Sequence, residues 1–287
     1  MRRYALILPA LMLIVALLIS GCGNGAAAPS SVSSVSPANT ASSSLSSRAN
    51  EEVTVYAAAS LTEPFQDIAQ SFSAKNSGAQ VVFNFGGSSQ LRSQIEQGAP
   101  AGVFAAANVK EMDTLVQAGL ISGQPATFAR NRLVVIIPKA NPGKIQRLQD
   151  LARDGVRFVA AGPSVPAGAY SLQVLEKMSA DPAYGAGFKD KVTNNLISQE
   201  TDVKQVVAKI QLGEGDAGMV YLTDVTPKVA PDVQVMEISD SLNVVAEYPI
   251  ALVKDAKESK LGQAFVSFVL SGEGQAILKK HNFLPGN

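Results

Sequence analysis

The sequence contains a single histidine and a single cysteine in 287 residues. A serine hydrolase that used Ser60 or Ser88 as its nucleophile would need a general base beside it. The only histidine, His281, lies in the last predicted helix near the C-terminus, where a surface or capping role is expected. No cluster of histidine and cysteine residues is present to bind a metal cation. These scarcities argue against an enzyme and against a bound cofactor.

An excess of charge of either sign is also lacking. The 24 lysine and arginine residues balance the 24 aspartate and glutamate residues. The sequence has no basic run and no interleaving of basic with aromatic residues, which are features of nucleic-acid-binding surfaces. We therefore expect no nucleic-acid partner.

The N-terminus has the pattern of a signal peptide. A short basic start at residues 1–4 precedes an apolar run at residues 5–19, and Ser20, Gly21 and Cys22 follow. The alternative is an uncleaved membrane-spanning helix, but that needs about 20 apolar residues and this run is shorter. Residues 19–22 resemble a bacterial lipobox, which predicts cleavage before Cys22 and its lipidation. We expect a lipid-anchored protein on the extracytoplasmic face of the cell membrane, in a periplasm or at the cell surface.

The next segment, residues 23–50, consists mostly of serine, alanine, glycine, proline and asparagine. It has too few large apolar side chains to offset the entropy of ordering, so it is predicted to be a disordered tether. The residues from Glu51 onward exceed one typical domain and suit two small lobes. The predicted division is 1–22 signal peptide, 23–50 tether, 51–132 plus 248–287 lobe 1, and 133–247 lobe 2.

Short β-rich runs alternate with helical periodicity after residue 51, which is typical of the α/β class with strands joined by crossover helices. Each lobe is expected to be a mainly parallel sheet flanked by helices. Strands are predicted at residues 53–57, 80–85, 103–106, 133–137, 157–161, 217–221, 233–238 and 248–253. Apolar residues at helical spacing predict helices near 61–72, 91–95, 112–116, 169–178, 203–210 and 261–280, the last interrupted at 271–274.

Four segments place small or hydroxyl residues between the end of a strand and the start of a helix. A helix start has free N–H groups and the positive end of the helix dipole, so it attracts anions without a charged side chain. Four such starts facing one cleft would enclose a small anion. The alternative is that each is an ordinary helix cap, since the same residue types are preferred there. The segments are residues 58–60, 86–89, 166–169 and 200–203.

Three further polar side chains have to be considered: Asp202 lies within the last of these segments, and Tyr221 and Asp224 follow it in the sequence. Tyr221 ends an apolar strand, where its hydroxyl is placed to donate a hydrogen bond into the cleft. The alternative for Tyr221 is an aromatic residue of the core or the rim. Asp202 and Asp224 are expected to cap helices or turns, because a bound dianion would repel their carboxylates.

Six separated motifs, spread over nearly all of residues 52–287, occur in the order and at the spacing of a known protein family. They are VTVYAAASLT at 53–62, residues 83–91, RNRLVV at 130–135, VPAG at 165–168, VY at 220–221 and EYPI at 247–250. Together they resemble the molybdate-binding proteins of ABC transporters. This resemblance implies a type II periplasmic-binding-protein fold with the ligand in the cleft between two lobes.

The resemblance also implies which residues hold the ligand. Ser60 and Ser88 would supply hydroxyl and backbone donors, Ala167 and Val203 backbone N–H groups, and Tyr221 its hydroxyl. None of the five is acidic, which suits a fully ionised dianion, whereas phosphate usually retains a proton and benefits from a carboxylate acceptor. A metal would enter only as the centre of the oxyanion, held by the same residues.

The chain departs from the family pattern at three places. Gly102 stands where aspartate is usual after the Pro-Ala pair, and Asn108 stands where aspartate is also common. Neither is an expected ligand contact. Leu222 and Thr223 replace a smaller pair after the tyrosine, which leaves the shape of that cleft edge open.

The function implied by the resemblance is capture of molybdate, or of tungstate, and its delivery to an ABC permease and its ATPase. The expected oligomeric state is a monomer. Two alternatives stay open at this point. One is a type II binding protein for another oxyanion such as sulfate, and the other is a sensory or adhesive lipoprotein without a transport role.

Overall fold

The computed structural model describes residues 51–254, 256 and 259–286. The predicted signal peptide, the predicted lipidation site Cys22 and the predicted tether at residues 23–50 lie outside the described residues. Within the described ranges, no helix combines the length and the apolar character that crossing a membrane requires.

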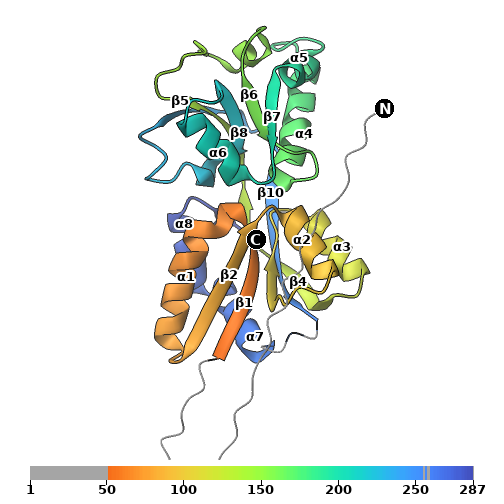
Figure 1. Cartoon of the computed structure of the whole chain (residues 1–287), viewed down its shortest axis with the longest axis vertical. Helices are drawn as coiled ribbons and strands as arrows, with labels where there is room; N and C mark the ends of the chain where they lie inside the picture. Colours follow the sequence, from red (N-terminus) through yellow and green to blue (C-terminus); the bar gives the residue numbers. More distant parts are fainter. Residues whose placement is uncertain (1–50, 255, 257–258, 287) are drawn as a thin grey trace, which may run out of the picture. The chain divides into compact units, whose positions relative to one another are not determined.

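Two β-sheets with flanking helices make up this part of the chain (Figure 1). We use lobe 1 for the sheet with strand order β11-β4-β10-β3-β1-β2 and its helices, and lobe 2 for the sheet with order β7-β6-β8-β5-β9 and its helices. The strands of lobe 1 are β1 (Glu51–Ala58), β2 (Ala79–Gly86), β3 (Val103–Ala105), β4 (Ile121–Asn131), β10 (Ala246–Val253) and β11 (Leu284–Pro285). Those of lobe 2 are β5 (Leu133–Pro138), β6 (Phe158–Ala161), β7 (Leu196–Glu200), β8 (Ala217–Tyr221) and β9 (Val233–Glu237).

The helices divide between the lobes in the same way. Lobe 1 contains the short 3₁₀ helix η1 (Ala59–Leu61) and the α-helices α1 (Thr62–Lys75), α2 (Ser88–Glu96), α3 (Val109–Gln117), α7 (Ser259–Leu270) and α8 (Gly272–Lys280). Lobe 2 contains η2 (Leu148–Ala152), α4 (Pro166–Ala180), α5 (Phe188–Asn194), α6 (Val203–Gln211) and η3 (Leu222–Asp224).

The two-lobed α/β class is confirmed, but both sheets are mixed, so the prediction of mainly parallel sheets was wrong in that respect. In lobe 1, β1 pairs in parallel with β2 and β3, while the pairs of β10 with β3 and β4, and of β11 with β4, are antiparallel. In lobe 2, β6 pairs in parallel with β7 and β8, while β5 is antiparallel to β8 and β9. Each antiparallel pair includes a strand next to a passage between the lobes, where no crossover helix sets the direction.

The chain passes between the sheets twice, from β4 to β5 and from β9 to β10. Buried Asn243, in the returning segment, ties the two passages together. Its Oδ1 accepts a hydrogen bond from the Leu133 N–H (3.1 Å), and its Nδ2 donates to the Leu133 carbonyl (2.8 Å). Both segments are thereby held side by side where the lobes meet.

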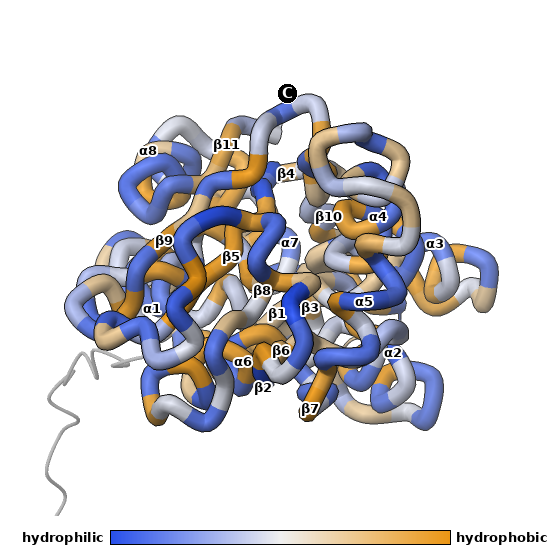
Figure 2. Tube along the Cα trace, turned by 90° about the horizontal axis from the view of Figure 1, so that it is seen from above, coloured by the Kyte–Doolittle hydropathy of each residue, from blue (hydrophilic) through white to orange (hydrophobic). Residues whose placement is uncertain are grey.

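An aromatic cluster fixes the first helix of lobe 1 on its sheet. Phe65 of α1 is fully buried, and its ring centroid lies 5.7 Å from that of Phe128 and 5.9 Å from that of Phe265. Burial of each such ring contributes about 2–3 kcal/mol. Figure 2 shows apolar residues (orange) concentrated along inner strands such as β5 and hydrophilic residues (blue) mostly on outer turns. The packing of α1 sets the position of Ser60, one turn before Phe65.

In lobe 2 a glycine allows a helix to begin directly against its sheet. A Cβ atom on Gly168, in the first turn of α4, would lie 2.1 Å from the Gly162 carbonyl oxygen and 2.3 Å from that of Ala161. These are backbone atoms of β6 and the loop after it, which cannot move aside cheaply. Only glycine lets the start of α4 approach so closely.

Most predicted elements are confirmed, with three differences. The helix predicted from Ala169 begins at Pro166, because proline fits the first helical turn, where its missing N–H is not needed. Strand β4 was not predicted, since Gly123 (φ 74°) and Pro125 interrupt its alternation. Helix α5 and strands β7 and β11 were also missed. The predicted break at residues 271–274 is confirmed: the Ser271 side chain caps α8.

Candidate functional site

A small cavity lies where four strand-to-helix segments from both lobes converge. Its volume, counted as the space open to the centre of a water-sized group, is about 10 Å³, which is roughly the room that one water needs. All five residues predicted to bind an oxyanion line it, namely Ser60, Ser88, Ala167, Val203 and Tyr221. The other lining residues are Ala58, Ala59, Gly86, Gly87, Ala107, Val165, Pro166 and Asp202.

Helix starts face this cavity from both lobes. Ser88 and Val203 are the first residues of α2 and α6, Ala167 is the second residue of α4, and Ser60 lies in η1, directly before α1. The first N–H groups of a helix have no partner within it and carry the positive end of the dipole. The structure therefore brings together the four predicted segments as a set of uncharged donors.

Ser88 keeps its hydroxyl proton free to donate. The Ser88 side chain is buried, and its Oγ accepts a hydrogen bond from the Ala107 N–H (3.0 Å). A hydroxyl has one proton to donate as well as lone pairs to accept. Because the Ala107 contact occupies only a lone pair, the Ser88 proton remains for a ligand in the cavity.

Ser60 ends a chain of hydrogen bonds that begins at Asn131. The Asn131 Oδ1 accepts from the Arg132 N–H (2.9 Å), which orients the amide so that its Nδ2 donates to the Tyr248 hydroxyl (3.3 Å). The Tyr248 hydroxyl lies 3.0 Å from the Ser60 Oγ. Because Tyr248 accepts from Asn131 and keeps its own proton, it is able to donate to Ser60, an arrangement that leaves the Ser60 proton for the cavity.

Tyr221 carries a donor without a partner. Its side chain is 1% exposed, and its hydroxyl has no hydrogen-bond partner among the described residues. Burial raises the pKa of this phenol well above its usual value, so it stays a neutral donor. A buried hydroxyl without a partner costs about 1–3 kcal/mol, and a ligand that accepts its hydrogen bond would recover this cost.

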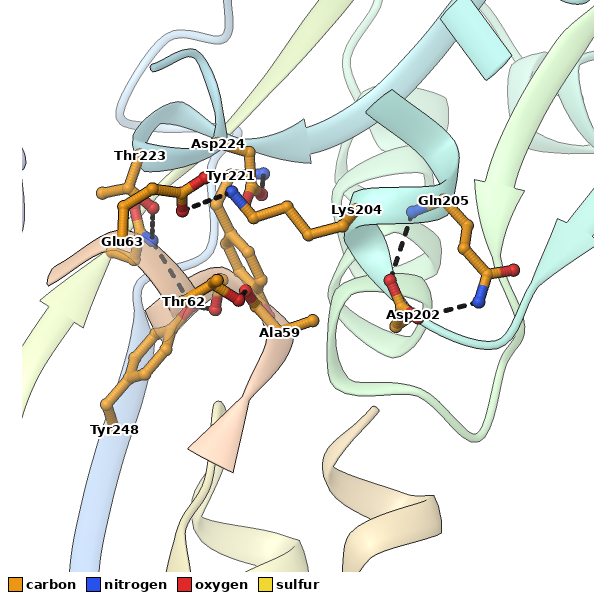
Figure 3. Close-up of polar contacts among 12 residues, drawn as sticks. Ala59, Thr62, Glu63, Asp202, Lys204, Gln205, Tyr221, Thr223, Asp224 and Tyr248 are labelled. Atoms are coloured by element: carbon orange, nitrogen blue, oxygen red, sulfur yellow. Dashed lines mark hydrogen bonds and ion pairs between the residues drawn. The ribbon is translucent and has the colours of Figure 1, made fainter. Parts of the chain in front are cut away.

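The charged groups around the cavity are turned to other partners (Figure 3). Asp202 caps α6: its two carboxylate oxygens accept from the backbone N–H (3.1 Å) and the side-chain amide (2.8 Å) of Gln205. The Asp224 carboxylate accepts from the Tyr221 N–H (3.0 Å). Both predicted capping roles are confirmed. No lysine or arginine is among the cavity-lining residues, so the arrangement suits an anion held by neutral donors.

Asp224 is fully buried beside this site. Burial raises the pKa of its carboxyl to about 6, although nearby Lys204 acts in the opposite direction. Its Oδ1 has no hydrogen-bond partner within the described part of the chain, and the Lys204 Nζ lies 3.7 Å away. The carboxylate thus holds the Tyr221 backbone in place without entering the cavity lining.

The only histidine lies away from both serines. His281 is the C-cap residue of α8, and its Nε2 lies 2.8 Å from the Asp67 carboxylate. The predicted capping role is confirmed. Within the described ranges, no group of three or more histidine, cysteine, aspartate or glutamate residues is placed to hold a metal ion.

Sequence reasoning missed the residues that support the donors. Asn131 and Tyr248 lie within two motifs of the family resemblance, but the sequence does not predict that they orient the donors. Gly87 abuts lobe 2, because a Cβ there would lie 2.3 Å from the Thr201 carbonyl oxygen. Asn131 follows Arg130 and Tyr248 follows Glu247, and these neighbours do not indicate that the two side chains contact each other or Ser60.

The chain is similar to bacterial solute-binding proteins over most of its length. A family model described as bacterial extracellular solute-binding protein matches residues 53–284. The molybdate-binding protein ModA of Mycobacterium tuberculosis is 37% identical over 231 residues, which is 80% of this chain and 84% of the relative. A putative ABC transporter substrate-binding lipoprotein of Bacillus subtilis, YvgL, is 27% identical and covers 98% of both chains.

Two solved structures share the fold. The periplasmic molybdate-binding protein of Azotobacter vinelandii superposes with a TM-score of 0.70 at 24% identity, covering 81% of this chain and 98% of that chain. The sulfate-binding protein SubI of M. tuberculosis gives a TM-score of 0.72 at 19% identity, covering 82% and 86%. The extent of the family match and the identity to ModA carry the assignment: the chain belongs to the bacterial extracellular solute-binding proteins, in the group that includes ModA.

Proposed function

We propose that the protein binds molybdate in the cavity between its lobes and delivers it to an ABC importer. The observation that carries this proposal is the unpartnered, buried Tyr221 hydroxyl in a cavity that is also lined by the Ser60 and Ser88 hydroxyls and by no lysine or arginine. Ser60, Ser88 and Tyr221 would donate from their hydroxyls, and Ala167 and Val203 from their backbone N–H groups. The 37% identical relative named as a molybdate-binding protein supports the choice of ion.

The chemistry of the donors favours a fully ionised tetrahedral oxyanion. Molybdate, tungstate and sulfate are dianions at neutral pH and only accept hydrogen bonds. Phosphate usually retains a proton and would need an acceptor, but Asp202, the one carboxylate in the cavity lining, is occupied by Gln205. Among the dianions, preformed donors select by bond length, because an ion of the wrong size leaves gaps or clashes.

The proposed cellular setting follows from the N-terminal sequence. Cleavage before Cys22 and its lipidation would anchor the protein to the cell membrane, with residues 23–50 as a tether on the extracytoplasmic side. The similarity to a putative substrate-binding lipoprotein over 98% of the chain supports this anchor. The partners would be the ABC permease and its ATPase, and the protein would act as a monomer. We place the lobe boundaries near residues 132 and 247.

Two other functions compete with this proposal. One is transport of another oxyanion such as sulfate. The fold alone does not separate the two, since its TM-scores to a sulfate-binding and a molybdate-binding protein are 0.72 and 0.70. The other is a sensory or adhesive lipoprotein, in which the cavity would have no transport role.

Titration calorimetry with molybdate, tungstate, sulfate and phosphate tests the proposal on protein that begins at Glu51. We expect tight binding of molybdate and tungstate, weak binding of sulfate and phosphate, and a raised melting temperature with each tight ligand. Tight binding of sulfate alone would favour the other transport function. The double variant Ser60→Ala, Ser88→Ala should lose oxyanion binding while it still melts cooperatively, and an unresponsive wild type would contradict the proposal.

A further inference from the structure

An ion pair joins the two lobes at the edge of the cavity. Lys204 is the second residue of α6 in lobe 2, and Glu63 is the second residue of α1 in lobe 1. The Lys204 Nζ lies 2.7 Å from the Glu63 Oε2 (Figure 3). The two side chains are 25% and 36% exposed, so water screens the pair only in part.

Lys204 also balances a second carboxylate within its own lobe. Its Nζ lies 3.7 Å from the Asp224 Oδ1, which is buried and has no hydrogen-bond partner among the described residues. The other Asp224 oxygen accepts from the Tyr221 N–H. One ammonium group therefore faces a carboxylate from each lobe, next to the tyrosine that lines the cavity.

The position of Lys204 is not explained by the stability of its helix. A cation in the first turn lies at the positive end of the helix dipole, where it is unfavourable. Lys209, in the last turn of the same helix, shows the favourable arrangement and pairs with Glu200 of its own lobe at 2.8 Å. Glu63 is in the first turn of α1, where an anion is favourable. Two contacts account for the position of Lys204: the one with buried Asp224 in its own lobe and the shorter one with Glu63 across the lobes.

We propose that Lys204 is a positioning residue: its pairing with Glu63 holds the lobes closed around the bound anion and slows its release. The proposal rests on the proposed function, because the pair borders the same cavity. Opening the lobes separates Lys204 from Glu63, so closure gains the energy of this contact whichever anion is bound. Neither residue is among those that line the cavity, so neither selects between ions.

The test compares Lys204→Met and Glu63→Gln with the wild type in the full chain. Calorimetry with molybdate and tungstate should show each single variant binding both ions about 3- to 10-fold more weakly, with the ratio between the ions unchanged. The double variant should bind no more weakly than Lys204→Met alone, because Lys204→Met already removes the contact with Glu63. Lys209→Met is the matched control: it removes the same charge from the same helix and should change affinity less than twofold.

A second measurement does not depend on the ligand. Without anion, amide hydrogen exchange in Lys204→Met should be several-fold faster in the segments that face the other lobe, residues 58–63, 86–91 and 201–206, and unchanged in core strands. Wild-type affinity and wild-type exchange in Lys204→Met would overturn the proposal. An affinity loss matched by Lys209→Met would do so too, because it would show a general effect of charge or of helix stability. If the wild type binds neither ion, the proposed function fails, and the exchange comparison still decides whether the pair holds the lobes closed.

Discussion

Replacing Tyr221 with phenylalanine should change ligand binding and the stability of the ligand-free protein in opposite directions. The ligand-free protein buries the Tyr221 hydroxyl without a partner within the described residues. Phenylalanine keeps the ring and removes the hydroxyl. The free energy of unfolding should therefore stay the same or rise by at most about 3 kcal/mol. Most single substitutions of buried residues lower stability, which makes a rise informative.

The bound state should show the reverse effect. A hydrogen bond from a neutral donor to a charged acceptor contributes about 1.5–3 kcal/mol. Its loss corresponds to about 10- to 150-fold weaker binding of molybdate. Titration calorimetry gives the affinity, and chemical denaturation without ligand gives the stability.

Tyr248→Phe is the matched control for this experiment. The Tyr248 hydroxyl contacts both Ser60 (3.0 Å) and Asn131 (3.3 Å), so its removal takes a partner from the buried Ser60 hydroxyl and leaves the Asn131 Nδ2 with Thr223 alone. This variant should lose about 1–3 kcal/mol of stability. The reasoning is refuted if Tyr221→Phe binds molybdate as tightly as the wild type, or if both variants lose similar stability.

Two further predictions concern closure and pH. Gly87→Ala should weaken anion binding at least tenfold, because the new Cβ would lie 2.3 Å from the Thr201 carbonyl oxygen of the other lobe. The free energy of unfolding should change by no more than about 1 kcal/mol, because alanine readily adopts the backbone angles of Gly87, φ −63° and ψ 130°. Gly272→Ala is the control for calorimetry, since Gly272 does not line the cavity and a Cβ there would meet no atom within 4 Å; equal losses in both variants would contradict this reasoning. Asp224→Asn should gain stability relative to the wild type as pH rises from about 4 to 6, by about 3 kcal/mol in total. Burial raises the pKa of this carboxyl to about 6, so the folded wild type holds a proton that the unfolded chain loses, and its stability falls across that window. Denaturation at pH 4, 5, 6 and 7 would contradict this if the two profiles run parallel.

The donors of the site could be predicted from sequence because each lies in a local pattern. Ser60, Ser88 and Val203 stand where a strand ends and a helix begins, and such a pattern needs only a few neighbouring residues. That they bind the anion stays a prediction. The residues that orient the donors could not be found in this way, because the contact between Asn131 and Tyr248 joins positions 117 residues apart.

The mixed sheets were missed for a related reason. Strand β10 reads as an ordinary apolar strand, yet its neighbours are β3 and β4, which precede lobe 2 in the chain. Local periodicity indicates that a segment is a strand and which of its faces is buried, but it does not indicate the partner or the direction. The ion pair between Glu63 and Lys204, 141 positions apart, is equally invisible to local patterns.

The two passages between the sheets have a consequence for the order in which the protein folds. The sheet of lobe 2 uses strands between Leu133 and Glu237 only, whereas that of lobe 1 places β10 (Ala246–Val253) between two strands that end before residue 132. Lobe 2 can therefore complete its sheet as soon as its own residues emerge during synthesis or export. Lobe 1 must wait with unpaired strand edges until more than 100 further residues arrive. We expect the aggregation-prone stage of folding to belong to lobe 1, and truncation at the C-terminus to damage lobe 1 while sparing lobe 2.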